Sequence, residues 1–279
     1  MPSAIPSRKR PKRSSASEPL VRLSELIQEL ELVSRENYSR AKVTALAKRL
    51  ADLAEKADLV RRPSFIFDPS DPTLVGRFVA MMLAAQQQFP LSTLGKFYGT
   101  GVYAIYYHGG FKPYKPISKS QHPIYVGKAK PINSKAAEAT AQGIKLWARL
   151  GEHRRTIEKA TSTLQSSNFT CRFLVVATGY ETAAEHYLIQ LFRPIWNSEI
   201  KLCYGIGKHG DDAETRKNGR SPWDTLHPGR PWALKSKTDQ KPPARIESEL
   251  RVHFRDHKPY KTLGTILSHC LSEIPQLPE

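Results

Sequence analysis

Two short runs of strand-forming residues, each bordered by glycine, constrain the fold of this chain more than any other feature. The first run covers residues 102–107, follows Gly101 and ends before a pair of glycines, and the second covers residues 123–127. Tyrosine, isoleucine and valine dominate both runs, as is typical of β-strands. Residues 112–121 lie between the runs, so the sequence predicts two strands joined by a long hairpin connection.

The residues that follow predict a helix at 144–160, a third strand at 169–177 and a second helix at 181–192, which Pro194 ends. Another helix is expected upstream at 73–88, begun by Asp71 or Thr73 as its cap. The order strand, strand, helix, strand, helix indicates an α+β fold. We therefore expect a small antiparallel three-stranded sheet flanked by helices, with a helical hairpin before it and a loop-rich extension after it.

Four segments of different composition suggest how the chain is organised. Residues 1–18 form a basic arm that we expect to be disordered, and residues 19–62 carry apolar side chains at the spacing of two paired helices. Residues 63–200 hold the expected core. Residues 201–279 are rich in glycine, proline and basic residues, and we expect them to recognise a partner and to contact a second subunit, with a helix at 263–271.

The basic arm contains five cations within residues 8–13. It is consistent with an arm that contacts phosphates, with a nuclear localisation signal, or with a solvated tail that binds nothing specifically. The sequence leaves these three interpretations open.

The charge of the whole chain indicates the class of partner. The 43 basic and 26 acidic residues give a formal net charge of +17, which favours a polyanion. The longest apolar run covers only residues 78–85, whereas a membrane-spanning helix needs about 18. The three cysteines are widely spaced and predict neither a disulfide framework nor a metal clip. We therefore expect no membrane association and a reducing, cytoplasmic location.

Five polar side chains in and after the predicted strands could together hydrolyse a phosphodiester. Each alone is more typical of packing or of a solvated helix face. Hydrolysis needs a base or water-positioning group, cations that neutralise the phosphate, and a hard oxygen ligand for a divalent metal. A tyrosine has an ordinary pKa of about 10 and would need a neighbouring cation to act as a base, and Lys128 or His153 could supply it. The five residues are Tyr103, Tyr125, Arg149, His153 and Glu185.

These residues resemble the signature of the GIY-YIG nuclease superfamily. Gly101-Val102-Tyr103 and Tyr125-Val126-Gly127 match the paired tripeptides, with valine in place of the first isoleucine, and the helical pair, the glutamate and Asn197 follow in order. This resemblance covers residues 101–197. Across residues 67–232 the chain is also similar to type II restriction endonucleases that cut the palindrome CCGCGG, which we expect to be bacterial and cytoplasmic.

The resemblance implies a role for each site residue. Tyr103 would act as general base or position the attacking water, and His153 would hydrogen-bond to Tyr103 or to that water. Arg149 and Tyr125 would donate to the phosphate oxygens, with Lys128 nearby. Asn197 would anchor the wall of the site or bind the phosphate. Glu185 would be the metal ligand for one Mg²⁺ per active site, with Mn²⁺ as a substitute.

A palindromic duplex has two-fold symmetry, so the resemblance also implies a homodimer, with assembly into a tetramer left open. Guanine presents two acceptors in the major groove that arginine reads bidentately. The candidates for contacting DNA lie after the core, and for each of them phosphate contact or a solvated loop is an equal alternative. They are Lys208, Arg216, Arg220 and Arg230.

Three functions agree with these observations. The first is a Mg²⁺-dependent restriction endonuclease that acts on double-stranded DNA at a GC-rich palindrome. The second is a homing or repair endonuclease of the same superfamily. The third is a DNA-binding protein without catalysis, which the complete set of active-site residues disfavours, because a binding module has no need of a metal-binding carboxylate beside a phosphate.

Overall fold

The computed structural model describes residues 17–33, 40–57, 60, 65–207 and 219–274. Two compact units divide the chain: residues 1–66 with 276–279, and residues 67–275. The basic run at residues 8–13 lies outside the described residues. We describe each unit by itself.

The N-terminal unit contains two packed helices, α1 (Ser17–Val33) and α2 (Arg40–Ala57). Both lie within the residues that predict a helical hairpin. The apolar side chain of Leu46 is buried, and those of Leu26 and Leu53 are half-buried. Leucines at helical spacing therefore form the contact between the two helices.

The larger unit is built on one antiparallel sheet with the strand order β1-β4-β2-β3. The strands are β1 (Phe89–Pro90), β2 (Gly101–Tyr107), β3 (Tyr125–Ala129) and β4 (Phe169–Val175). The predicted α+β class is confirmed, but the prediction of three strands is wrong, because β1 adds a fourth at the edge beside β4. This strand has only two residues, one of them proline, so no alternating pattern could reveal it.

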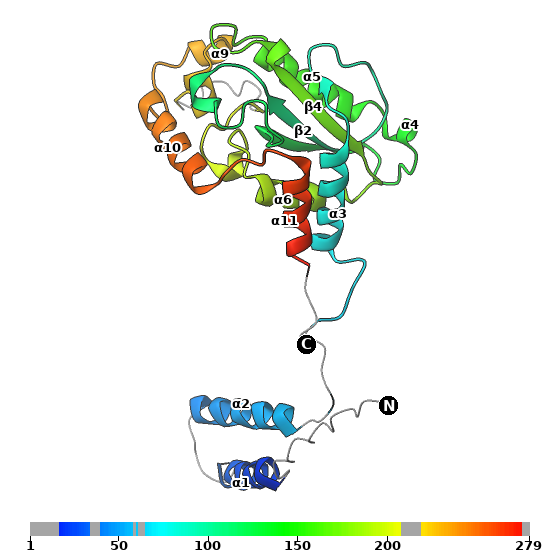
Figure 1. The fold of residues 1–279 in the computed structure, drawn as a ribbon, viewed down its shortest axis with the longest axis vertical. Helices are drawn as coiled ribbons and strands as arrows, with labels where there is room; N and C mark the ends of the chain where they lie inside the picture. The colour runs from blue at the N-terminus through cyan, green and yellow to red at the C-terminus, as the bar shows by residue number, and fades with distance from the viewer. Residues whose placement is uncertain (1–16, 34–39, 58–59, 61–64, 208–218, 275–279) are drawn as a thin grey trace, which may run out of the picture. The chain divides into compact units, whose positions relative to one another are not determined.

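Both faces of the sheet are covered, which explains why β2 has no polar alternation. Tyr103, Ile105 and Tyr107 pack with the helix α5 (Lys145–Ile157) in one hydrophobic cluster. Val102, Ala104 and Tyr106 point to the opposite face. There they meet the helices α3 (Pro72–Ala85), α6 (Glu181–Phe192) and α11 (Leu263–Ser272), which Figure 1 shows grouped on one side of the sheet.

The ends of the helices follow local chemistry. The Oδ1 atom of Asp71 accepts a hydrogen bond of 2.8 Å from the backbone nitrogen of Thr73 and caps α3, with Pro72 in the first turn. Helix α6 has the predicted bounds and ends at Arg193, which adopts a left-handed conformation with a φ of 46°. Helix α3 ends three residues before the predicted boundary, because the chain then turns into β1.

Residues after 200 share the core of the larger unit and contain more helix than the sequence predicts. Besides α11, which agrees with the helix expected at 263–271, they form α8 (Pro222–Leu226), α9 (Pro231–Leu234) and α10 (Pro243–Asp256). Trp223, Ile246 and Leu250 belong to the cluster on the α5 side of the sheet. Residues 246, 250 and 254 are apolar and lie four positions apart, which is typical of a helix. This pattern indicates α10, although we expected a loop-rich extension there.

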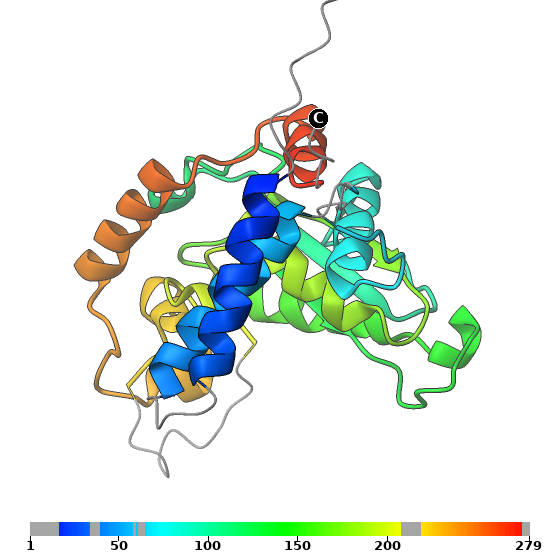
Figure 2. The same cartoon turned by 90° about the horizontal axis from the view of Figure 1, so that it is seen from below.

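Short helical turns connect the main elements: η1 (Lys112–Tyr114), α4 (Ala139–Gln142), η2 (Ser166–Asn168) and η3 (Ser198–Ile200). The segment after α10 runs beside the long hairpin connection (Figure 2), where the backbone nitrogen of Gln121 donates to the carbonyl of Tyr260. Cys171, Cys203 and Cys270 are buried free thiols. Within the described residues, no helix combines the length and the apolar character that crossing a bilayer requires.

Candidate active site

The pairing of β2 with β3 sets the position of the first candidate residue. Tyr103 stands directly opposite Gly127, and its ring lies across the backbone of that residue. A Cβ atom at position 127 would lie only 2.5 Å from the Oη atom of Tyr103. Glycine is therefore needed in the second tripeptide so that the first tyrosine can lie flat against the neighbouring strand.

Helix α5 brings an imidazole to this tyrosine. The Nε2 atom of His153 lies 2.7 Å from the Oη atom of Tyr103, which is the length of a hydrogen bond. Both side chains are buried, with exposed fractions of 2% and 0%. The ring of Tyr125 is half-buried, and its centroid lies 4.7 Å from that of His153. The two tyrosines and the histidine thus form one cluster.

Arg149 lies one helical turn before His153. Its Nη1 atom is 2.6 Å from the Oε2 atom of Glu152.

Burial raises the pKa of Tyr103 well above 10.0, and the nearby charge of Arg149 only partly opposes this effect. The pKa of Tyr125 is raised as well, again first by burial. In this state both phenols therefore keep their protons at neutral pH.

The candidate carboxylate reaches the same site from the other face of the sheet. Glu185 is on α6, and its Oε2 atom lies 2.8 Å from the Nζ atom of Lys128 on β3. Because β3 is an edge strand, Glu185 can line a pocket of about 230 Å³ together with Tyr125, which projects from the opposite face. The negative charge of Glu185 also contributes to the raised pKa of Tyr125.

Asn197 connects this pocket to the edge strand. Its Oδ1 atom accepts a hydrogen bond of 3.0 Å from the nitrogen of Val126, and its Nδ2 atom donates one of 2.9 Å to the carbonyl of the same residue. These bonds satisfy backbone groups of β3 that no further strand covers. The amide of Asn197 thus joins the lining of the pocket to the backbone of β3.

The structure adds residues to this site that the sequence reasoning missed. Glu199 lines the pocket as a second carboxylate, and residues 205–207 form part of its wall. A Cβ atom at Gly207 would lie 3.5 Å from the Nη2 atom of Arg149. The glycine-rich stretch at 205–210 is a visible signal in the sequence, but by composition alone it resembles the rest of the basic extension.

The candidates for contacting DNA have different surroundings. Lys208 and Arg216 lie outside the described residues. Arg220 is half-buried and pairs with Asp239, with Nε to Oδ1 at 2.8 Å. Arg230 is only 3% exposed and is bound to Asp224 by two hydrogen bonds of 2.6 and 2.7 Å. The expectation that Arg230 reads bases is therefore corrected: its guanidinium is used inside the protein and does not present donors at the surface.

The donor set suits a metal ion that needs few protein ligands. Glu185 and Glu199 are the two acidic residues among those that line the pocket. In the part of the chain that the structure describes, no group of three or more histidine, cysteine, aspartate or glutamate side chains forms a metal site. Magnesium commonly binds through one or two carboxylates and keeps several waters. The pocket therefore fits Mg²⁺, with Glu185 as its expected ligand.

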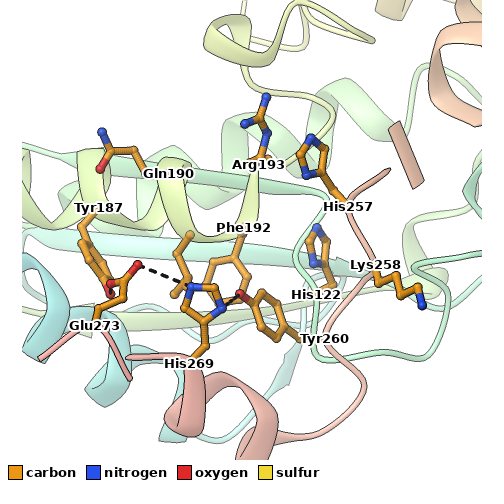
Figure 3. A pocket seen from close by; sticks show the side chains of 11 residues that line it. His122, Tyr187, Gln190, Phe192, Arg193, His257, Lys258, Tyr260, His269 and Glu273 are labelled. Atoms are coloured by element: carbon orange, nitrogen blue, oxygen red, sulfur yellow. Dashed lines mark hydrogen bonds and ion pairs between the residues drawn. The ribbon is translucent and has the colours of Figure 1, made fainter. Parts of the chain in front are cut away.

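A second pocket, of about 430 Å³, lies between the end of α6, α11 and residues 257–260. Several of its side chains are basic, but Figure 3 shows that Arg193 and Lys258 point away from each other rather than toward a common point. The residues with the predicted catalytic roles do not line it. The pocket at the edge of β3 is therefore the candidate active site.

Comparison with known proteins gives a family match. The family model described as the Eco29kI GIY-YIG domain matches residues 95–254. This range contains the parts of the site: β2, β3, α5, α6 and the wall at 205–207. A search of curated proteins finds no match.

Proposed function

Because this chain belongs to the Eco29kI GIY-YIG family of restriction endonucleases, we propose that it cuts double-stranded DNA site-specifically, as a type II enzyme. The observation that supports the proposal most is the convergence of residues that are far apart in the sequence. The phenol of Tyr103 is bonded to the imidazole of His153, the ring of Tyr125 lies beside both, and Tyr125 shares a pocket with Glu185.

The cationic side chains would bind the scissile phosphate. Arg149 lies against the pocket wall at Gly207, and Lys128 lies beside Glu185 at the edge of the same pocket. A phosphate that enters would meet both charges, which stabilise the additional negative charge of the transition state. Tyr125 keeps its proton and can donate a hydrogen bond to a phosphate oxygen.

Tyr103 and His153 would act together on the attacking water. A phenol with a raised pKa is a poor base by itself, so we assign the proton to Tyr103 and the acceptor role to Nε2 of His153. Tyr103 can then accept a proton from water while its own proton passes to the imidazole. Both side chains are buried, so this transfer requires a water molecule to reach the pair.

Glu185 would hold Mg²⁺, with Lys128 giving up its ion pair when the metal binds. The chemistry that Mg²⁺ supplies in such a site is stabilisation of the charge that develops on the phosphate oxygens. Mn²⁺ has similar ligand preferences and would substitute for it.

The finer features of the function are part of the same proposal. We infer that the recognition site is a GC-rich palindrome, and CCGCGG is the site that the resemblance implies. We also infer a homodimer that presents one active site to each strand. Arg216 and Arg220 remain candidates for reading guanine, and Lys208 for contacting phosphate.

One experiment tests the proposal directly. Purified protein should be incubated with DNA of known sequence in Mg²⁺ and in EDTA, and the ends of all products should be mapped. We expect cleavage at one GC-rich palindrome in Mg²⁺ and none in EDTA. Cuts at many sites or at a long asymmetric site would favour a repair or homing enzyme, and binding without any cut would favour a DNA-binding protein that lacks catalysis.

A further inference from the structure

A buried ion pair lies behind the wall of the candidate active site. The Nε and Nη2 atoms of Arg230 donate to the Oδ1 and Oδ2 atoms of Asp224, at 2.6 and 2.7 Å. The guanidinium lies over the rings of Trp223 and Trp232, with its carbon 4.8 and 4.6 Å from their centroids. Both charged side chains are almost fully buried.

The same guanidinium also holds the backbone of the wall. Its Nη2 atom donates to the carbonyl of Gly205 at 2.9 Å, and its Nη1 atom donates to the carbonyl of Ile206 at 3.2 Å. Gly205 has a φ of +120°, and a Cβ atom there would lie 2.2 Å from the Oγ atom of Ser221. The chain is therefore pressed against the start of α8, and Arg230 holds its two carbonyls there.

This backbone borders the reaction site. Residues 205–207 line the pocket that contains Tyr125 and Glu185, and Gly207 approaches the guanidinium of Arg149. Removing two charges from water opposes folding, and apolar replacements of such pairs are often equally stable. The bonds to the two carbonyls are a function that an apolar replacement would not provide.

We propose that Arg230 and Asp224 are positioning residues for catalysis: the pair holds residues 205–207 at the distance from Arg149 that the reaction requires. This inference rests on the proposed nuclease function. Both side chains are buried, so they do not offer a surface to DNA. They act through the wall, and therefore affect the reaction rate more than the binding of DNA.

The test uses Arg230→Lys, which keeps the positive charge but loses the fork that joins Asp224 to the two carbonyls. The matched control is Arg172→Lys. Arg172 is also a buried arginine that donates to a backbone carbonyl, that of Gln86 at 2.7 Å, and that lies over an aromatic ring, that of Tyr106. It faces the α6 side of the sheet, opposite Ala104 in the strand register.

Cleavage of a duplex that contains the mapped site should be measured in Mg²⁺, below the melting temperature of each variant. We expect Arg230→Lys to lower kcat by about tenfold or more and to change KM by less than about threefold, because small displacements at a reacting centre have large effects on rate. Arg172→Lys should change neither constant. Asp224→Asn should reproduce the effect on kcat, and it replaces Arg230→Lys if that variant does not fold.

A double-mutant cycle with Arg149→Ala separates positioning from a general loss of structure. If the wall acts through Arg149, adding Arg230→Lys to Arg149→Ala should lower kcat by less than about twofold, because the interaction has already been removed. Additive effects in the cycle, or an unchanged kcat in both Arg230→Lys and Asp224→Asn, would overturn the inference.

The outcome for the wild-type chain keeps the two proposals apart. If it cleaves and the Arg230 and Asp224 variants behave like the control, only the positioning role fails. If it does not cleave, the nuclease proposal fails. In that case, a crystal structure of Arg230→Lys tests whether the pair holds the wall. Residues 205–207 should move away from Arg149. An unmoved wall would refute the inference.

Discussion

The bond between the Tyr103 hydroxyl and the His153 imidazole is the most specific polar contact of the candidate site. It joins two buried side chains over 2.7 Å, and burial keeps the phenol protonated. The ring packs over Gly127 with or without the hydroxyl, so removing the hydroxyl tests its role without emptying that space. The hydroxyl is therefore the group to remove.

Tyr103→Phe should keep the ring and lose only that hydroxyl. We expect DNA binding to be retained and the turnover rate to fall by about a hundredfold or more, the lower range for loss of a general base. Cleavage rates and binding isotherms check this result. Tyr106→Phe is the control, because Tyr106 is a buried tyrosine of the same strand that faces the opposite side. Equal rates for the two variants would contradict the role of Tyr103.

The carboxylate of Glu185 is one of two that line the candidate site, and it is the one paired with Lys128. It is half-buried, is paired with Lys128 and opens into the pocket beside Tyr125. An ion pair as exposed as this one contributes little to stability, about 0–1 kcal/mol. Its removal should therefore affect the reaction rather than the fold.

Glu185→Gln should abolish measurable cleavage in Mg²⁺ while DNA affinity and melting temperature stay close to those of the wild type. The reason is that a neutral amide is a much weaker ligand for a hard cation. Glu158→Gln at the C-cap of α5 is the control, because its carboxylate pairs only with Arg154 among the described contacts and does not line the pocket. Cleavage by Glu185→Gln at the parental rate would show that the metal ligand lies elsewhere.

At the scale of elements, the edge strand β3 organises the site. Gly127 of this strand lies opposite Tyr103 of β2. The next residue, Lys128, pairs with Glu185 of α6, and Asn197 bonds to the outer backbone at Val126. A strand inside a sheet could not bring side chains from both faces into one pocket. The edge position of β3 is thus what allows α5 and α6, on opposite faces, to act together.

Gly127→Ala tests this arrangement. The added methyl group would meet the Tyr103 hydroxyl at 2.5 Å, so the ring or the strand must move. We expect a loss of stability of about 1–3 kcal/mol, as for overpacked cores, together with a fall in kcat. Urea unfolding and cleavage rates check both. Gly110→Ala, where a Cβ atom meets nothing within 4 Å, should change neither quantity.

At the scale of the whole molecule, buried histidines link stability to pH. Burial lowers the pKa of His122 to about 3 and that of His227 to about 3, and it lowers the pKa of His253 to about 4. The nearby His253, Lys261 and His257 lower the pKa of His122 further. The unfolded chain binds protons at these positions near pH 6.5, whereas the folded chain does not. Stability is therefore present above about pH 6.5 and is lost as the pH falls toward 4.

We expect the melting temperature to fall steeply between pH 6.5 and pH 4, with about 1.4 kcal/mol lost per pH unit for each fully buried histidine. His122→Phe should reduce this dependence, because its ring packs against Phe192 and Tyr260 and phenylalanine would keep that packing. Thermal unfolding at several pH values measures the effect. The same acid sensitivity in His122→Phe would show that His122 does not contribute to it.

The sequence determined the elements that local chemistry controls. Strand-forming residues between glycines define β2 and β3, helical spacing with Pro194 defines α6, and the paired tripeptides with Arg149, His153, Glu185 and Asn197 identify the family. The strands and helices depend on residues close together in the sequence, and the family signature depends only on the order of its residues along the chain. Such patterns are visible without a structure.

Only the tertiary structure decided which of these residues meet, because contacts across the sheet join segments that are distant in the sequence. It placed Lys128 against Glu185, gave Asn197 the backbone of Val126, and added β1 to the sheet. It also showed that Arg230, which we expected to contact DNA, is buried and paired with Asp224. A charged side chain has the same sequence signal whether it faces DNA or a buried carboxylate, and only packing distinguishes the two.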